Sequence, residues 1–156
     1  MPIPTRLANF LDQNRVSYEV LHHPVAYTAQ ELSAVEHVPG KRHAKVVMID
    51  AEGERVMAVL PSDHRVDLRQ LAALIGKPCY LAAEDDFATL FPDCERGTMP
   101  PIGRLYNMVT YVDRSLASDL DIVFEAGTHT EAIRMRYADF ERIAKPTIGD
   151  FAEKTH

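Results

Sequence analysis

A lysine within an apolar run is the residue whose type and position are best suited to a role in catalysis or ligand binding. Lys45 lies in the otherwise apolar run Ala44–Ile49, directly after the polar loop Pro39–His43. At the mouth of a strand, a lysine stem can pack along apolar walls while its ammonium group is held over a pocket. The simpler alternative is a lysine that faces solvent from a half-buried strand, and position alone leaves both open.

The loop Gly97–Gly103, Gly-Thr-Met-Pro-Pro-Ile-Gly, is a second candidate. Its adjacent prolines fix the backbone, and its glycines allow positive φ angles or a close approach to a ligand. Such a rigid loop can hold backbone N–H and C=O groups at the fixed positions that ester cleavage requires. A structural crossover loop would have the same composition.

The segment Ala126–Thr130 is predicted to be a turn that separates two strands, and it contains His129. An imidazole at such a turn can exchange hydrogen bonds with a substrate or transfer a proton near neutral pH. A solvated turn histidine is the alternative.

The seven histidines of the chain raise a different hypothesis, a metal-dependent hydrolase. The candidate ligands are His22, His23, His43, His64 and His129. No pair has the HxH or HExxH spacing of zinc sites, and the two cysteines do not form a CxxC pair. The sequence also lacks a GxSxG elbow, a P-loop and a GxGxxG motif, so we expect neither a metal nor a cofactor.

These candidates must be positioned by a mixture of helices and strands. Apolar spacing and capping signals predict helices at about 4–14, from Thr28 to Pro39-Gly40, and at 68–75, 84–90 and 138–144. Strands are predicted at 16–20, 44–49, 55–60, 108–112, 122–125 and 132–135. Because tight turns join several strands and regular βαβ alternation is absent, we expect an α+β domain with a mixed, mostly antiparallel sheet.

Composition favours one domain over residues 1–156, since the length and the 46% of hydrophobic residues suffice for a single core. The net charge of −6 argues against an extended nucleic-acid surface, so any contact with nucleic acid should be small and local. Apolar runs too short for a bilayer, an N-terminus unlike a secretion signal and only two cysteines predict a cytoplasmic protein without membrane contact.

In their order along the chain, these motifs resemble the YbaK-type aminoacyl-tRNA deacylases, a family that includes the editing insertion domain of bacterial prolyl-tRNA synthetases. The resemblance runs from about residue 20 to residue 145. It rests on His23-Pro24-Val25, Tyr27–Glu31, the approach from Pro39-Gly40 to Lys45, Val66–Leu71, Gly97–Gly103 and Gly127-Thr128-His129. Each motif alone is weak, and their shared order and spacing make the match specific.

The resemblance implies a strongly curved mixed sheet surrounded by helices, and hydrolysis of the ester between an amino acid and the terminal adenosine of tRNA. Because the neighbouring ribose hydroxyl activates this ester, the enzyme must place a water, stabilise the oxyanion and bind the acceptor end. Lys45 is implied to hold phosphate or ribose oxygens, and Gly103 to be the closest approach of its loop to the substrate. The implied substrate-binding residues are Tyr27, Thr28, Pro101, Ile102, Gly127 and His129.

Two departures from the family pattern concern specificity. Well-known members carry asparagine after the lysine, where this chain has Val46, and others carry Gly-Gly-Arg-Arg near the late turn, where it has Glu125–His129. The family favours a small amino acid, alanine, serine, threonine or cysteine. Editing is expected to occur in trans, because no synthetase domain is attached.

A non-catalytic module that binds a tRNA end or a nucleotide and acts with a synthetase is the alternative. Lys45 and the Pro-Pro loop would serve either function. The acceptor end of aminoacyl-tRNA is therefore the expected partner in both cases, with a synthetase as a second candidate.

Overall fold

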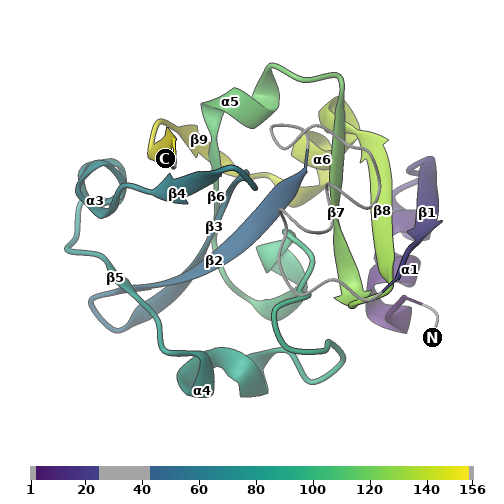
Figure 1. Ribbon diagram of the computed structural model, residues 1–156, viewed down its shortest axis with the longest axis horizontal. Helices are drawn as coiled ribbons and strands as arrows, with labels where there is room; N and C mark the ends of the chain where they lie inside the picture. The colour runs from purple at the N-terminus through teal and green to yellow at the C-terminus, as the bar shows by residue number, and fades with distance from the viewer. Residues whose placement is uncertain (1–2, 25–42, 155–156) are drawn as a thin grey trace.

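Two β-sheets form the centre of the protein, whose computed structural model describes residues 3–24 and 43–154 (Figure 1). The smaller sheet is antiparallel, with the order β1-β8-β7. The larger sheet has the order β5-β2-β3-β6-β9, in which β5, β2 and β3 pair antiparallel and β3, β6 and β9 pair parallel. The strands are β1 (Tyr18–His22), β2 (Ala44–Ala51), β3 (Glu54–Pro61), β5 (Tyr80–Leu81), β6 (Thr110–Asp113), β7 (Asp121–Thr128), β8 (Glu131–Arg136) and β9 (Thr147–Gly149). An additional antiparallel pair is formed by β4 (His64–Val66) and β10 (Ala152–Lys154).

Helices cover these sheets, with α1 beside β1 and β8 on one side of the molecule and α3 on the other (Figure 1). The helices are α1 (Thr5–Gln13), α3 (Leu68–Ile75), α4 (Glu84–Phe87), α5 (Arg114–Ala117) and α6 (Tyr137–Ala144), with short 3₁₀ turns η1 (Ala88–Leu90) and η2 (Gly103–Tyr106). Leu7 and Leu11 of α1, four residues apart on one face, are fully buried in the larger core. In α3, the Asp67 carboxylate caps the N-terminus and Gly76 ends the helix in the left-handed conformation.

The β2–β3 hairpin separates two hydrophobic clusters. Its two-residue turn, Glu52-Gly53, has positive φ at both positions, as a type I′ turn requires. Side chains alternate along β2. Ala44, Val46 and Met48 therefore pack into the larger cluster, and Val47, Ile49 and Ala51 pack into the smaller one with Leu71 and Phe151.

The predicted α+β class with a mixed sheet is confirmed, as are the helices predicted at about 4–14, 68–75 and 138–144 and the two strands predicted at 44–49 and 55–60. Several strand boundaries were wrong. The first strand begins at Tyr18 rather than at residue 16, and β6 begins at Thr110 rather than at residue 108. The first strand continues through His22, and β7 continues to Thr128 because a bulge after Glu125 lets pairing resume at Thr128 with Glu131. The turn between β7 and β8 is therefore only His129-Thr130. The helix predicted from Thr28 lies outside the described residues.

Several short elements were missed: β4, β5, β9, β10, α5 and η2. Each has only two to four residues, too few for an apolar period to appear in the sequence. Within residues 3–24 and 43–154, no helix is long and apolar enough to cross a membrane.

Candidate active site

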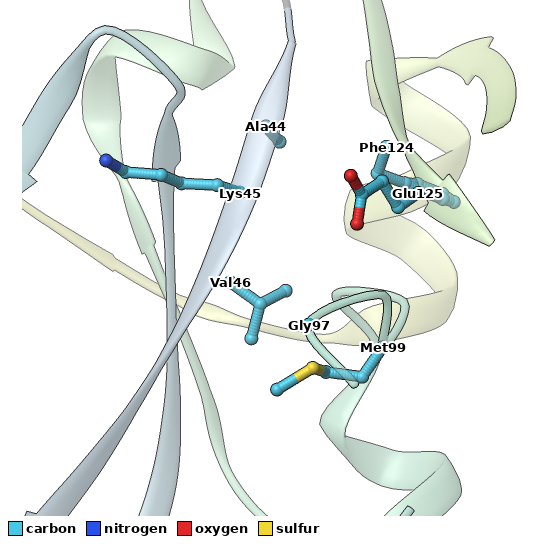
Figure 2. A pocket seen from close by; sticks show the side chains of 7 residues that line it. All are labelled: Ala44, Lys45, Val46, Gly97, Met99, Phe124 and Glu125. Carbon is cyan, nitrogen blue, oxygen red and sulfur yellow. The ribbon is translucent and has the colours of Figure 1, made fainter. Parts of the chain in front are cut away.

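A cavity of about 170 Å³ opens where the two sheets meet, between the start of β2 and the middle of β7. An isolated parallel bridge between His43 and Val123 joins the two sheets beside it. The cavity is lined by Ala44, Lys45 and Val46 of β2, Gly97 and Met99 of the predicted loop, and Phe124 and Glu125 of β7 (Figure 2). The lysine and the first half of the loop, separated by about fifty residues in the sequence, thus meet at one site.

The wall formed by the loop is fixed by backbone hydrogen bonds to β7. The Gly127 N–H donates to the Thr98 carbonyl at 2.8 Å, and the Glu95 N–H donates to the Gly127 carbonyl at 2.9 Å. Glu95 and Thr98, which these two bonds anchor to Gly127, are the ends of a four-residue turn in which Gly97 has a φ of 78°. Thr98 is buried while Gly97 is exposed, so this turn presents the Gly97 backbone at the cavity.

The side chain of Lys45 leaves β2 on the face opposite to Val46, away from Met99 and Glu125 (Figure 2). Strand alternation requires this, because Lys45 shares its face with Val47 and with its cross-strand partner Leu60. Burial lowers the pKa of Lys45, and the nearby Asp63 carboxylate opposes that shift. Lys45 therefore lies at the edge of the cavity, with its ammonium group on the Asp63 side of the strand.

Glu125 brings a carboxylate to a site that is lined by both polar and apolar atoms. Figure 2 shows its oxygens directed from β7 toward the start of β2. Apart from Lys45 and the exposed Gly97 backbone, its neighbours in the lining are the apolar side chains of Ala44, Val46, Met99 and Phe124. The described lining thus combines apolar side chains with one acidic and one basic residue, a mixture typical of sites for small polar ligands.

The second half of the predicted loop belongs to the core. Pro101 is buried, and Ile102 is fully buried in the larger hydrophobic cluster. Gly103 is also buried, and its N–H donates to Thr110 Oγ1 at 2.8 Å. A Cβ at this glycine would lie 2.5 Å from the same oxygen and 2.6 Å from the Met108 carbonyl oxygen. In this structure Gly103 makes a close approach to β6, and its amide is already bonded.

The late-turn residues also lie beside the cavity rather than in its described lining. Gly127, with a φ of 90°, packs against Pro4 and holds the loop through its backbone. His129 is partly exposed in the turn between β7 and β8. Tyr27 and Thr28 lie outside the described residues, so the structure does not place them.

Val46, Phe124 and Glu125 line the cavity but were not among the predicted site residues, and Met99 was predicted only as part of the Gly97–Gly103 loop. For Glu125 a signal was present, since the acid ends the apolar run Ile122–Phe124 much as Lys45 interrupts the run after Ala44. Met99, Val46 and Phe124 gave no such signal, because an apolar residue in a strand or loop is equally expected in the core.

A smaller cavity adjoins the site and shares Gly97 and Met99 with it. Cys94 contributes to its wall, and the Cys94 sulfur lies 3.3 Å from the Tyr106 hydroxyl oxygen. Burial raises the pKa of the Cys94 thiol to about 11, so the group is protonated at neutral pH and is a poor nucleophile.

Two buried histidines, His23 and His43, lie close enough for their charges to interact. Burial, with a smaller contribution from His23, lowers the pKa of His43 to about 4. Within the described part of the chain, no group of three or more histidine, cysteine, aspartate or glutamate side chains could hold a metal ion.

The model of the aminoacyl-tRNA editing domain family matches residues 23–143, well over half of the chain. The chain belongs to this family. The matched range contains all seven residues that line the cavity, so the site lies within the editing domain. The predicted family is confirmed, and with it the predicted class of reaction, hydrolysis of the ester bond in aminoacyl-tRNA.

Named relatives of this editing domain cover nearly its whole length. It is 26% identical over 151 residues to the multifunctional Ser/Thr-tRNA deacylase ProXp-y of Escherichia coli K12, covering 94% of this chain and 90% of that protein. It is 23% identical to the prolyl-tRNA editing protein ProX of Acetoanaerobium sticklandii, with 90% of each chain covered.

Solved structures confirm the fold of the editing domain. The crystal structure of a hypothetical protein superposes with a TM-score of 0.86 at 21% identity, covering 95% of this chain and 99% of that one. The crystal structure of a candidate trans-editing enzyme for prolyl-tRNA synthetase superposes with a TM-score of 0.81 at 19% identity, covering 95% of each chain.

Proposed function

We propose that this protein is a trans-editing deacylase that removes a small amino acid, alanine, serine, threonine or cysteine, from a mischarged tRNA. The observation that carries the proposal is the cavity of about 170 Å³ beside Lys45, within an editing domain. This volume exceeds the roughly 10–15 Å³ that one water needs, so a small aminoacyl group and an attacking water can enter together. The E. coli relative is named as a deacylase of Ser- and Thr-tRNA, which agrees with this size class.

Lys45 is proposed to bind phosphate or ribose oxygens of the acceptor end. Its ammonium group lies across β2 from Val46 and Glu125, at the edge of the cavity (Figure 2). The nucleic acid can therefore rest against the Asp63 side of the strand while the amino acid enters between β2 and β7. In this arrangement Lys45 positions the ester without itself attacking it.

In the proposed reaction, a water attacks the ester carbonyl and a tetrahedral oxyanion forms. The bond to the ribose oxygen then breaks, that oxygen takes a proton, and the free amino acid and uncharged tRNA leave. The exposed backbone at Gly97 is proposed to face this carbonyl. Pro101, Ile102 and Gly103 are proposed to support the loop from the core, and Gly127 to fix it to β7. Tyr27 and Thr28 stay predicted pocket residues.

The experiment that tests this function is a deacylation panel across all twenty charged tRNAs, with the protein at substoichiometric concentration. Release of several equivalents of a small amino acid per protein is the expected result. Binding of tRNA without turnover would contradict the deacylase and favour a non-catalytic module that acts with a synthetase. Cytoplasmic localisation, where tRNA is charged, follows from the same proposal.

A further inference from the structure

The turn between β3 and β4 brings an aspartate and a histidine to the Lys45 side of β2. The Ser62 N–H donates to the His43 carbonyl at 2.8 Å, so the turn is fixed to the residue before β2. The Asp63 carboxylate lies 2.6 Å from His64 Nδ1 and close enough to Lys45 for their charges to interact. Asp63 therefore interacts with both Lys45 and His64.

A second lysine reaches this group from β10. His64 is paired directly with Lys154 across the β4–β10 ribbon, so their side chains leave the same face of the ribbon. Two residues along each strand, the pair Val66 and Ala152 uses that face to pack on the smaller hydrophobic cluster. Lys45 leaves β2 on the side of the same cluster. The two lysines therefore lie at the edge of one hydrophobic cluster.

A buried carboxylate holds the backbone of β10 in place. Asp113, at the end of β6, accepts hydrogen bonds from the N–H groups of Phe151 and Ala152, each at 2.9 Å. The Phe151 side chain is fully buried, which anchors the start of the strand. Lys154, two residues after Ala152, therefore has a defined backbone position beside β4.

The two faces of the β4–β10 ribbon differ in charge. On one face, Arg65 and Glu153 form an ion pair, so their charges balance. On the other face, Lys154 and Lys45 outnumber the single carboxylate of Asp63, which is bonded to a histidine. In a chain of net charge −6, this is a local excess of positive charge, which attracts the phosphate groups of nucleic acid.

We infer that Lys45 and Lys154 form one binding face for the phosphate groups of the tRNA acceptor end, with the Asp63–His64 pair between them. The inference deepens the proposed function and rests on it, because the nucleic acid is proposed to lie on this side of β2. It adds one lysine, from the far end of the sequence, to the contact proposed for Lys45. The face is small, as the net charge of −6 requires.

The test measures binding of uncharged tRNA by fluorescence anisotropy at several salt concentrations. Lys154→Gln should weaken binding and make the log–log salt dependence shallower by about 0.7, the value for one phosphate contact in a single strand. The matched control is Arg65→Gln, which removes the same charge from the opposite face of β4. It should keep the wild-type slope. Both variants should keep the wild-type melting temperature, because both side chains are exposed.

An unchanged slope in Lys154→Gln, an equal change in Arg65→Gln, or no binding of uncharged tRNA by the wild type would each overturn the inference. An equal change in the two variants would mean that overall charge, and not this face, determines binding. The deacylation panel separates this result from the proposed function. Turnover together with an unchanged slope in Lys154→Gln contradicts the binding face alone, and the expected slope change without turnover contradicts the deacylase alone.

Discussion

The ammonium group of Lys45 and the carboxylate of Glu125 lie on opposite sides of β2 (Figure 2). We therefore expect Lys45 to meet phosphate or ribose oxygens of the acceptor end from outside the cavity, while the aminoacyl group enters between β2 and β7.

His129 is the residue whose role the cavity leaves open, because it lies in the β7–β8 turn beside the described lining. We expect His129→Ala to change the preference among alanyl, seryl and threonyl esters by about tenfold or more, or about 1.4 kcal/mol. The measurement is kcat/KM on each ester. A uniform loss on all three would instead assign His129 to catalysis or tRNA positioning, and no change would make it a solvated turn residue.

At the scale of elements, the site depends on how β7 holds the loop. Gly127 and Gly53 both have φ near 90°, so alanine pays a similar backbone cost at either position. A Cβ at Gly127 would also lie 2.5 Å from Pro4 Cγ, whereas a Cβ at Gly53 meets nothing within 4 Å. Of these two glycines, Gly127 therefore joins β7 to the loop and to the residue that caps α1.

We expect Gly127→Ala to lower the free energy of unfolding by at least about 1 kcal/mol more than Gly53→Ala, because of this overlap. It should also lower kcat/KM, since the loop wall of the cavity moves with Gly127. Urea unfolding and deacylation rates of the two variants measure both effects. Equal losses in the two variants would show that the contact with Pro4 does not matter.

Elements with strong local signals could be predicted from the sequence. The hairpin, the Asp67 cap and the rigidity of the Gly97–Gly103 loop all follow from neighbouring residues. In that loop, Gly97 and Met99 lie at the cavity and Ile102 lies in the core. This division depends on packing against β7 and could not be predicted from the sequence. The direction of the Lys45 side chain needed the register of β2 against β3, which a single strand does not reveal.

At the scale of the whole molecule, stability should depend on the neutral state of His43. Its side chain is fully buried, and its pKa in the folded protein is lowered to about 4. The unfolded chain, with a histidine pKa near 6.5, takes up this proton first as the pH falls. The stabilisation is therefore present above about pH 6.5 and is lost progressively toward pH 4.

We expect the free energy of unfolding to fall by on the order of 2 kcal/mol from pH 7 to pH 5 through this group. Urea unfolding at the two pH values measures the change. His43→Leu should reduce the pH dependence, whereas His22→Leu, where the histidine side chain is 75% exposed, should preserve it. The same pH dependence in His43→Leu and the wild type would contradict the assignment.

Because the net charge is −6, we expect tRNA to bind to a small part of this molecule, so the loss of one well-placed cation should weaken binding strongly. Lys45→Ala tests this most directly, with Lys77→Ala, whose ammonium group pairs with Glu54 at the start of β3, as the matched control. We expect Lys45→Ala to lower kcat/KM on the best mischarged tRNA to less than about a tenth, a loss above about 1.4 kcal/mol, with an unchanged melting temperature. Lys45→Arg should restore only part of the rate, and Lys77→Ala should retain it. A Lys45→Ala variant that keeps more than about a tenth of the wild-type kcat/KM would contradict the central role of this lysine.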